Sequence, residues 1–549
     1  MNANGIFDLG LDRREANYQS MTPVMFLDHA ALIHGDRTAV VYDDIRYSYR
    51  EFRLRCRLLA SSLSQLGVGI GDTVSVIAPN IPAMLEAHFG VPMVGAVLNT
   101  INVRLDHQAV SFILAHGEAK VLLVDVEYLP LAKKALSALR SRPIVIVIVD
   151  PSVIKEGSLD GFLDYEQLLV TGDPEFQWAP PEDEWQAICL NYTSGTTGNP
   201  KGVVYHSRGA YLNTLGNAIV FGLPPGSVYL WTLPMFHCNG WLYPWVGTLF
   251  GATHVCMRRI NPSEVFDIIA KEGVTHMCGA PIVLNMLASE ANVRGIRLAN
   301  EVAFGTGGAP PPSSTIARAE AVGFRVTHFY GMTELYGNAT HCFMQPHWED
   351  LSEDERRRLM IRQGVPYPTI GELRIAVPET CEAVPSDGKT LGELIIRGNT
   401  VMKGYLKNSA ATEETLGTGW LRTGDLGVVH PDGYVEIRDR EKDIIISGGE
   451  NISSLELEEL FHRHPAVLEV AVVARQDDVW GESPCAFIAL KPGVAVSDSD
   501  LIAWCRRHIS HYKVPKTVIF CDLPKTATGK ILKYELRQRA DALARSPVT

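Results

Sequence analysis

Short runs of apolar residues alternate with segments of helical periodicity along the first 440 residues of the chain. The apolar runs have the length of buried strands, and three of them are TVSVIAP (73–79), KVLLVD (120–125) and VTHMCGAP (274–281). Between such runs, segment 263–273 places Val265, Ile268 and Ile269 on one helical face and ends at Gly273. Strands that alternate with helices predict α/β units with mostly parallel sheets.

The pattern changes near residue 365. Short alternating stretches with Gly and Asp-Gly turns, such as GELRIAV, GELIIRG and GYVEIRDR, predict a small β-barrel over about 365–439. Beyond it, a helix (454–464), two strands (467–475 and 485–491) and two further helices (497–509 and from about 529) predict a separate α+β unit. We therefore expect an N-terminal domain over 1–439 and a C-terminal domain over 440–549.

Composition and charge narrow the class of protein. The 549 residues are too many for one hydrophobic core, and 46% hydrophobic with 20% charged residues is typical of a globular protein. A net charge of −12 argues against a partner that is a nucleic acid or an anionic membrane. The ten cysteines form no CxxC pair, and neither a signal peptide nor a membrane span is visible. We expect a cytoplasmic protein with reduced thiols.

One stretch, YTSGTTGNPKG (192–202), combines three glycines with hydroxyl side chains and one lysine. It is not a Walker A loop, because Lys201 is followed by Gly202 and an extended VVY rather than by Ser/Thr and a helix. It is not a dinucleotide fingerprint, since no GxGxxG opens a helix after a strand. Its backbone N–H and hydroxyl groups suit polyphosphate oxygens, and composition alone leaves a flexible surface loop equally open.

Four further motifs follow along the chain: GTGGAP (305–310), FYGMTE (329–334), GWLRTGD (419–425) and PKTATGK (524–530). Together with the loop at 192–202 they make the chain resemble the acyl-adenylate-forming superfamily of acyl-CoA synthetases, peptide-synthetase adenylation domains and beetle luciferases. The resemblance extends from about residue 20 to 540. It implies an α/β fold whose large N-terminal domain contains two α/β subdomains plus a small β-barrel, and whose small α+β C-terminal domain is mobile.

The resemblance implies a site for ATP. Residues expected around the β- and γ-phosphates are Thr193, Ser194, Gly195, Thr196, Thr197 and Lys201. Residues expected around the adenylate are Gly308, Ala309, Pro310, Tyr330, Gly331, Met332 and Thr333, with Tyr330 stacked on adenine. Asp425 and Arg440 are the expected ribose contacts. Thr333 and Glu334 are expected to hold Mg²⁺ and an α-phosphate oxygen, with Thr193 as a further metal ligand, because a hard cation suits oxygen ligands.

The resemblance also implies the residues of the acyl and thiol chemistry. Lys530 is expected to bridge the carboxylate and the α-phosphate, and the implied catalytic set is Lys530, Glu334, Thr333 and His237. The implied acyl pocket is formed by His237, Trp241, Gly307 and Gly331. The CoA tunnel is implied at His237, Gly448 and Gly449, and the hinge of the mobile domain at Lys442.

The implied reaction joins a carboxylic acid to CoA by way of an acyl-adenylate, with ATP, Mg²⁺ and CoA taking part. The segment PMFHCNGW (234–241) is most similar to short/medium-chain and aryl acyl-CoA synthetases, including 3-methylmercaptopropionate-CoA ligases, so we expect that thioether acid as the substrate. Aryl acids such as benzoate or cinnamate and fatty acids stay open as alternatives. An amino-acid adenylation domain is disfavoured, because no Asp stands in this segment to pair with an ammonium group. A luciferase-like oxidation and a non-catalytic ATP-binding protein also remain. We expect small-molecule partners, and a homodimer stays open.

Overall fold

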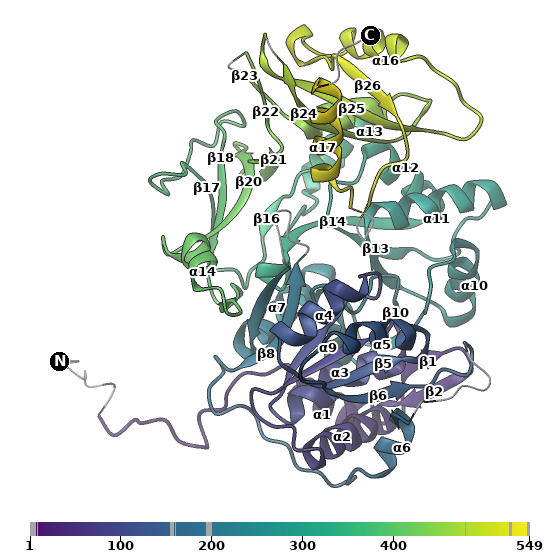
Figure 1. Cartoon of the computed structure of the whole chain (residues 1–549), viewed down its shortest axis with the longest axis vertical. Coiled ribbons are helices and arrows are strands. Elements are labelled where there is room, and N and C mark those ends of the chain that lie inside the picture. Colours follow the sequence, from purple (N-terminus) through teal and green to yellow (C-terminus); the bar gives the residue numbers. More distant parts are fainter. Residues whose placement is uncertain are drawn as a thin grey trace.

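The computed structural model describes residues 7, 9–153, 159, 161–193, 200–448, 450–477, 479–525 and 530–545. Its two large sheets with their helices form the lower and middle parts of the molecule in Figure 1, a small sheet lies at one side, and the last hundred residues lie at the top. No helix among these described ranges is long and apolar enough to cross a membrane.

The first large sheet has the order β19-β9-β8-β4-β3-β5-β6-β7. The strands β8 to β7 in this order are parallel, whereas β9 and β19 are antiparallel additions at one edge. Its central strands are rich in Val, Ile and Leu because helices cover both faces. The bounds are β3 Thr73–Ile77, β4 Val97–Thr100, β5 Ala119–Asp125, β6 Ile144–Ile148, β7 Leu163–Asp164, β8 Ala187–Thr193, β9 Lys201–His206 and β19 Gly404–Tyr405.

The second large sheet has the order β16-β15-β14-β13-β12-β10-β11-β1-β2. Its middle strands are parallel and the edge strands β2, β15 and β16 are antiparallel, so the predicted α/β class is confirmed. The bounds are β1 Thr38–Tyr42, β2 Ile45–Ser48, β10 Val228–Leu230, β11 Thr253–Val255, β12 His276–Gly279, β13 Val302–Thr306, β14 Phe324–Met332, β15 Gly337–His341 and β16 Val365–Pro366.

Helices cover these sheets. The helix expected at 263–273 is α10, which Asn261 caps at its start and Gly273 ends at φ 67°, in the left-handed region where glycine is unstrained. The helices before residue 440 are α1 Met25–Ile33, α2 Tyr49–Gln65, α3 Pro82–Met93, α4 His107–His116, α5 Leu129–Ser137, α6 Tyr165–Val170, α7 Ser207–Phe221, α8 Cys238–Trp241, α9 Tyr243–Leu249, α10 Pro262–Glu272, α11 Pro281–Arg294, α12 Ser313–Val322, α13 Glu353–Met360 and α14 Ser409–Leu416.

The region expected to be a small β-barrel is an open antiparallel sheet. It has the order β17-β18-β20-β21, with β17 Glu372–Ala376 and β21 Val435–Arg440 at its two edges, and its inner strands are β18 Gly392–Arg397 and β20 Leu421–Val429. The predicted strands are present, but four strands are too few to close a barrel that side chains can fill. The sequence pattern shows where strands lie and does not show whether the sheet closes.

The last hundred residues have a sheet and two hydrophobic cores of their own. The elements are β22 Ile445–Ser447, β23 Glu450–Ile452, α15 Ser454–His462, β24 Val467–Asp477, β25 Gly481–Leu490, α16 Asp498–Arg506, β26 Thr517–Phe520 and α17 Lys533–Arg545. The final helix starts four residues later than the sequence pattern suggests. This unit lies above the two large sheets in Figure 1.

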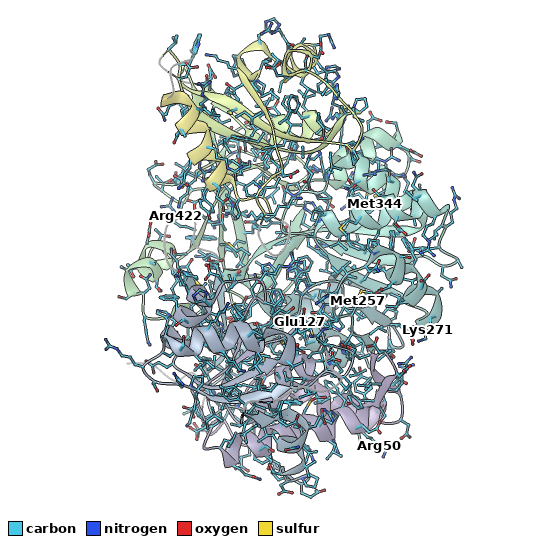
Figure 2. All side chains as sticks on the ribbon, turned by 45° about the vertical axis from the view of Figure 1, so that its right-hand side comes forward. Arg50, Glu127, Met257, Lys271, Met344 and Arg422 are labelled. Carbon is cyan, nitrogen blue, oxygen red and sulfur yellow. The ribbon has the colours of Figure 1, made fainter. Side chains whose placement is uncertain are left out.

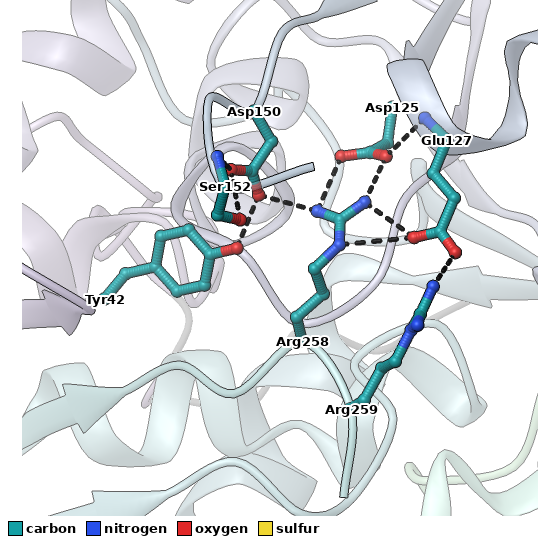
Figure 3. A network of polar contacts seen from close by, with 7 residues as sticks. All are labelled: Tyr42, Asp125, Glu127, Asp150, Ser152, Arg258 and Arg259. Carbon is teal, nitrogen blue, oxygen red and sulfur yellow. Dashed lines mark hydrogen bonds and ion pairs between the residues drawn. The ribbon is translucent and has the colours of Figure 1, made fainter. Parts of the chain in front are cut away.

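A buried polar cluster joins the two large sheets at the carboxyl ends of their strands (Figure 3). All three guanidinium nitrogens of Arg258, which follows β11, donate hydrogen bonds, and their acceptors are Asp125 at the end of β5, Asp150 after β6, and Glu127. Tyr42, at the end of β1, donates to Asp150 at 2.5 Å. In Figure 2, Glu127 of this cluster is labelled near the middle of the view, whereas Arg50 and Lys271 are labelled at its edge.

Candidate active site

A tyrosine, an aspartate and an arginine meet where the second large sheet approaches the small antiparallel sheet. Tyr330 near the end of β14 donates its hydroxyl to Asp425 Oδ2 at 2.6 Å, and Arg440 Nε lies 3.1 Å from Asp425 Oδ1. The antiparallel pairing of β20 and β21 places Asp425 directly opposite Arg440. Burial and the neighbouring Asp425 charge raise the pKa of Tyr330 well above its usual value, so the phenol is neutral. These three residues, predicted from separate motifs, form one cluster.

A second group lies beside the loop at 192–202, where the sequence predicts that the ATP phosphates bind and which is called the phosphate loop below. Tyr405 of β19 donates to Glu334 Oε1 at 2.8 Å, and the Lys201 ammonium lies 4.8 Å from the centre of the Tyr405 ring. Burial raises the pKa of the Glu334 carboxyl. Glu334 therefore gives this part of the site a buried acidic group that a cation would stabilise in its charged form.

The phosphate loop joins two antiparallel strands. Thr193 at the end of β8 lies opposite Lys201 at the start of β9, so the two predicted residues are adjacent across the hairpin. Lys201 opens a strand and not a helix, as the following VVY indicates. The remaining predicted residues of the loop, Ser194, Gly195, Thr196 and Thr197, lie outside the described residues.

Trp241 packs against backbone near the predicted acyl-pocket glycines. A Cβ atom built at Gly307 would lie 3.2 Å from Trp241 Cη2, so the indole ring reaches the backbone just after β13. A Cβ atom at Gly331 would lie 1.7 Å from the Gly337 carbonyl oxygen, and one at Gly337 would lie 3.2 Å from the Trp241 Cα atom. Glycine is thus required for these backbones to approach so closely. Trp241 itself is 5% exposed.

His237 and Thr333 lie on either side of one thiol. The Cys238 sulfur is 3.2 Å from Thr333 Oγ1 and 3.8 Å from His237 Nε2. Burial, with a smaller contribution from the Lys530 charge, lowers the pKa of His237 to about 4, so the imidazole is neutral at physiological pH. Gly308, Ala309 and Pro310 follow Gly307 as an exposed segment, and Met332 ends β14 immediately before Thr333.

Lys530 of the C-terminal unit faces this cluster. The residue is exposed, yet the protein atoms around the ammonium and the nearby Arg440 lower its pKa to about 8, against the opposing charges of Asp425 and Asp443. The lysine thus lies within electrostatic range of Asp425, Arg440 and His237. The structure thus brings Lys530 near Asp425 of the motif GWLRTGD.

Lys533 anchors the end of this segment. Its ammonium lies 2.8 Å from Glu458 Oε1 and donates to Ser454 Oγ at 2.6 Å. The backbone N–H of Ser454 in turn donates to Asp439 Oδ2 at 2.5 Å. This chain of contacts links the C-terminal unit to the end of β21, one residue before Arg440.

The predicted hinge and CoA-tunnel residues lie apart from one another. Lys442 is exposed in the turn after β21. Gly448 donates its N–H to the Trp480 carbonyl at 2.8 Å, and a Cβ atom there would lie 2.7 Å from the Trp480 ring, so Gly448 packs within the C-terminal unit. Gly449 lies outside the described residues.

Comparison with known proteins identifies the family of the chain. The family model described as AMP-binding enzyme matches residues 27–406, and the model of the AMP-binding enzyme C-terminal domain matches residues 456–530. The chain belongs to the AMP-binding enzyme family.

Members of this family that resemble the chain include acid–CoA ligases. One relative is the acetate–CoA ligase CCL3 of Humulus lupulus, 48% identical over 547 residues, which are 96% of each chain. Another is the peroxisomal acetate/butyrate–CoA ligase AAE7 of Arabidopsis thaliana, 48% identical over 554 residues, 98% of this chain and 97% of that one. Among solved structures, the anthranilate CoA ligase AuaEII in complex with anthranoyl-AMP matches with a TM-score of 0.84 and 24% identity, over 97% of this chain and all of that one, and shows the same fold.

The site of this family member holds few acidic side chains. No group of three or more His, Cys, Asp or Glu that could hold a metal occurs within the described ranges. Mg²⁺ binds in many enzymes through one or two carboxylates together with substrate phosphates. The single buried Glu334 beside the phosphate loop fits that mode and does not fit a cage of protein ligands.

Sequence reasoning missed two residues of the site. Tyr405 reaches Glu334 through the pairing of the two-residue strand β19 with β9, and so short a strand leaves no periodic signal. Cys238 was adjacent to a predicted residue and still missed, because the backbone turn that aims its sulfur at Thr333 is visible only in three dimensions. A GY pair before an exposed loop was the available signal for Tyr405.

Proposed function

We propose that the chain activates a short-chain carboxylic acid with ATP and transfers the acyl group to CoA. It is an ATP-dependent, AMP-forming acid–CoA ligase. The observation that carries the proposal is that Lys530 lies within electrostatic range of Asp425, Arg440 and His237, because a cation there can interact with both the acid and the nucleotide.

In the first step a carboxylate oxygen attacks the α-phosphorus of ATP, an acyl-phosphate anhydride bond forms, and pyrophosphate leaves. Two anions must approach each other, so positive charge held in place lowers the barrier. Lys530 is the group that lies between them, and Lys201 neutralises the departing phosphates. Asp425 accepts from the ribose hydroxyls, Arg440 supports it, and the Tyr330 ring stacks on adenine.

Mg²⁺ accompanies ATP in this proposal. Glu334 and Thr193 would hold it, with Thr333 near the α-phosphate. When bound, the ion neutralises charge on the phosphate oxygens. Tyr405 would hold the Glu334 carboxylate in position through the hydrogen bond that it donates to Oε1.

In the second step the CoA thiolate attacks the acyl carbonyl carbon, a thioester forms, and AMP leaves with the electrons of the broken C–O bond. Because His237 is neutral, it can lie beside the path of the CoA thiol without forming an ion pair with an anionic oxygen. We propose that the domain from residue 440 rotates about Lys442 between the steps, withdrawing Lys530 and bringing Gly448 and Gly449 to the CoA tunnel. The exposed position of Lys442 in a turn is compatible with a hinge.

The acid is short because Trp241 closes the pocket. A Cβ atom at Gly307 would lie 3.2 Å from its ring, and we expect a ring of this size there to leave room for a slim chain only. Relatives named for acetate and butyrate favour the same class. The specific acid that we propose is 3-methylmercaptopropionate, whose thioether chain has the shape of a short fatty acid. An apolar pocket separates such isosteres weakly.

A substrate panel tests the proposal. CoA-dependent AMP release is measured with acetate, butyrate, 2-methylpropanoate, 3-methylmercaptopropionate, hexanoate, benzoate, cinnamate and several amino acids. We expect the highest kcat/KM for acetate, 2-methylpropanoate, butyrate and 3-methylmercaptopropionate, whose chains extend by one to about four atoms beyond the carboxyl carbon. A preference for benzoate or cinnamate would favour an aryl-CoA ligase, and a preference for amino acids would refute the substrate class. ATP binding without AMP release for any acid would refute catalysis.

A further inference from the structure

The segment after His237 has an unusual backbone. Five consecutive residues, Cys238 to Leu242, have φ between 43° and 66°, in the left-handed region. Four of them carry side chains, for which this conformation is unfavourable, and Asn is the residue that tolerates it best after glycine. Two turns of hydrogen bonding hold it: Gly240 N–H donates to the His237 carbonyl at 2.8 Å and Leu242 N–H to the Asn239 carbonyl at 3.0 Å. We name residues 238–242 the left-handed turn.

The left-handed turn contains one predicted pocket residue and directly follows another. Trp241 lies within it and His237 immediately precedes it. The sulfur of Cys238, its first residue, faces Thr333. A relaxed, right-handed backbone would send these side chains elsewhere, so the shape of the acid site depends on whatever stabilises the turn.

A buried pair of asparagines stabilises it. Asn191 Nδ2 donates to Asn239 Oδ1, and the Asn239 backbone N–H donates to Asn191 Oδ1 at 3.3 Å. Asn239 is fully buried and Asn191 is 2% exposed. The remaining amide nitrogen of Asn239 reaches Thr100 Oγ1 at 3.5 Å, and Thr100 donates to the Phe236 carbonyl at 3.0 Å. Hydrogen bonds of Asn239, the second residue of the turn, thus hold the turn in place.

The other member of the pair, Asn191, lies next to the predicted ATP site. Asn191 lies in β8, two residues before Thr193, where the phosphate loop begins. One pair of side chains therefore contacts both the strand that leads to the ATP loop and the turn that forms the acid pocket.

We propose that the Asn191–Asn239 pair positions the left-handed turn, and through it Trp241, so that it sets the chain length of the acid. The inference rests on the proposed function. Neither asparagine touches the reacting atoms, so both act as positioning residues. Loss of the pair lets Trp241 leave the Gly307 backbone and lengthens the pocket.

The test uses four variants of the full chain: Asn239→Ala, Asn239→Gly, Asn191→Ala and the double variant Asn191→Ala/Asn239→Ala. Asn239→Gly keeps the left-handed backbone accessible and removes only the amide. Asn261→Ala, which removes the exposed cap of α10 far along the chain, is the matched control. Steady-state constants are measured for butyrate and hexanoate, together with thermal unfolding.

We expect each Asn239 or Asn191 variant to raise KM for butyrate roughly tenfold. The ratio of kcat/KM for hexanoate to that for butyrate should rise as well, since the pocket lengthens. The double variant should be no worse than the poorer single variant, because the two side chains act as one pair. Asn261→Ala should leave the ratio unchanged.

Equal losses for butyrate and hexanoate, or an Asn239→Gly variant with the wild-type ratio, would overturn the inference. A crystal structure of Asn239→Ala supplies a readout that needs no turnover, and Trp241 is expected to have moved away from Gly307. If wild-type protein activates no acid while Trp241 moves in this variant, the proposed function fails and the positioning role stands. An unmoved turn overturns the positioning role whatever the activity.

Discussion

Two groups of tyrosine, aspartate and arginine lie in the first 440 residues and differ in how fully their arginine is bonded. In the cluster of Figure 3, Arg258 is 11% exposed and donates to three carboxylates, while Tyr42 donates to Asp150. In the candidate site, the Arg440 side chain is 47% exposed, and Asp425 is the carboxylate that pairs with it among the described residues. Tyr330 donates to Asp425 as Tyr42 does to Asp150.

This difference indicates a structural role for the Arg258 cluster and a ligand-binding role for the Arg440 cluster. All N–H donors of Arg258 form hydrogen bonds within the protein. Its cluster therefore holds the two large sheets together and has no guanidinium donor left for a ligand. Arg440 retains exposed donors, and its cluster faces Lys530 across the junction with the C-terminal unit. The same three residue types therefore serve two roles, and the role follows from bonding and exposure rather than from residue type.

The largest expected effect is on stability, from Arg258→Met. Asp125 is fully buried, and without the guanidinium its charge is uncompensated, so we expect the free energy of unfolding to fall by about 3–5 kcal/mol. The first unfolding transition in urea measures this free energy. Arg259→Met is the control: its guanidinium, 74% exposed, pairs with Glu127, and its loss should cost about 0–1 kcal/mol. Equal effects of the two variants would contradict the assignment of the Arg258 cluster to structure.

The next effect is on the first half-reaction, from Lys530→Ala. Removing one donor that stabilises the transition state should lower acid-dependent ATP–pyrophosphate exchange by about 10²–10³-fold. Thioester formation from supplied acyl-AMP should survive, because the anhydride is already made. Unfolding should be unchanged, in contrast to Arg258→Met. The role assigned to Lys530 fails if both half-reactions fall equally.

A smaller effect is expected from Asp425→Asn. It removes the negative charge that pairs with Arg440 and that would accept hydrogen bonds from the ribose hydroxyls. Hydrogen bonds to charged groups contribute about 1.5–3 kcal/mol. KM for ATP should rise by roughly tenfold or more, while KM for the acid changes little. Asp150→Asn is the matched variant in the other cluster. It should lower stability and leave KM for ATP unchanged, and the reverse outcome would break the comparison.

The smallest effect is a pH dependence. Burial lowers the pKa of Lys530 to about 8, so its charged form is present below that pH and is lost as pH rises through it. The value of kcat/KM for ATP in the exchange reaction should therefore decline above about pH 8, by about tenfold per unit. Lys530→Arg should remove this decline, because a guanidinium stays charged. If kcat/KM for ATP still declines above this pH in Lys530→Arg, the decline comes from the titration of another group.

Some contacts of the candidate site could be expected from the sequence, and others could not. Tyr330, Asp425 and Lys530 were predicted from motifs far apart along the chain, and the structure brings them together. The buried pairs around them were not predictable, because Tyr405 and Asn191 depend on which strands pair and which way a backbone turns. The small sheet shows the same limit: its strands were visible in the alternation of apolar residues, and its openness was not.

The central claim, that the acid is joined to the α-phosphate before it meets CoA, is tested most directly with butyrate labelled with oxygen-18 in its carboxyl group. The protein is given ATP, Mg²⁺, CoA and the labelled acid, and the nucleotide product is analysed by mass spectrometry. If an acyl-adenylate forms in the cluster of Tyr330, Asp425 and Arg440, the AMP carries one labelled oxygen for each acyl-CoA made. Label in orthophosphate with ADP as the nucleotide product, or acyl-CoA made with unlabelled AMP, would contradict it.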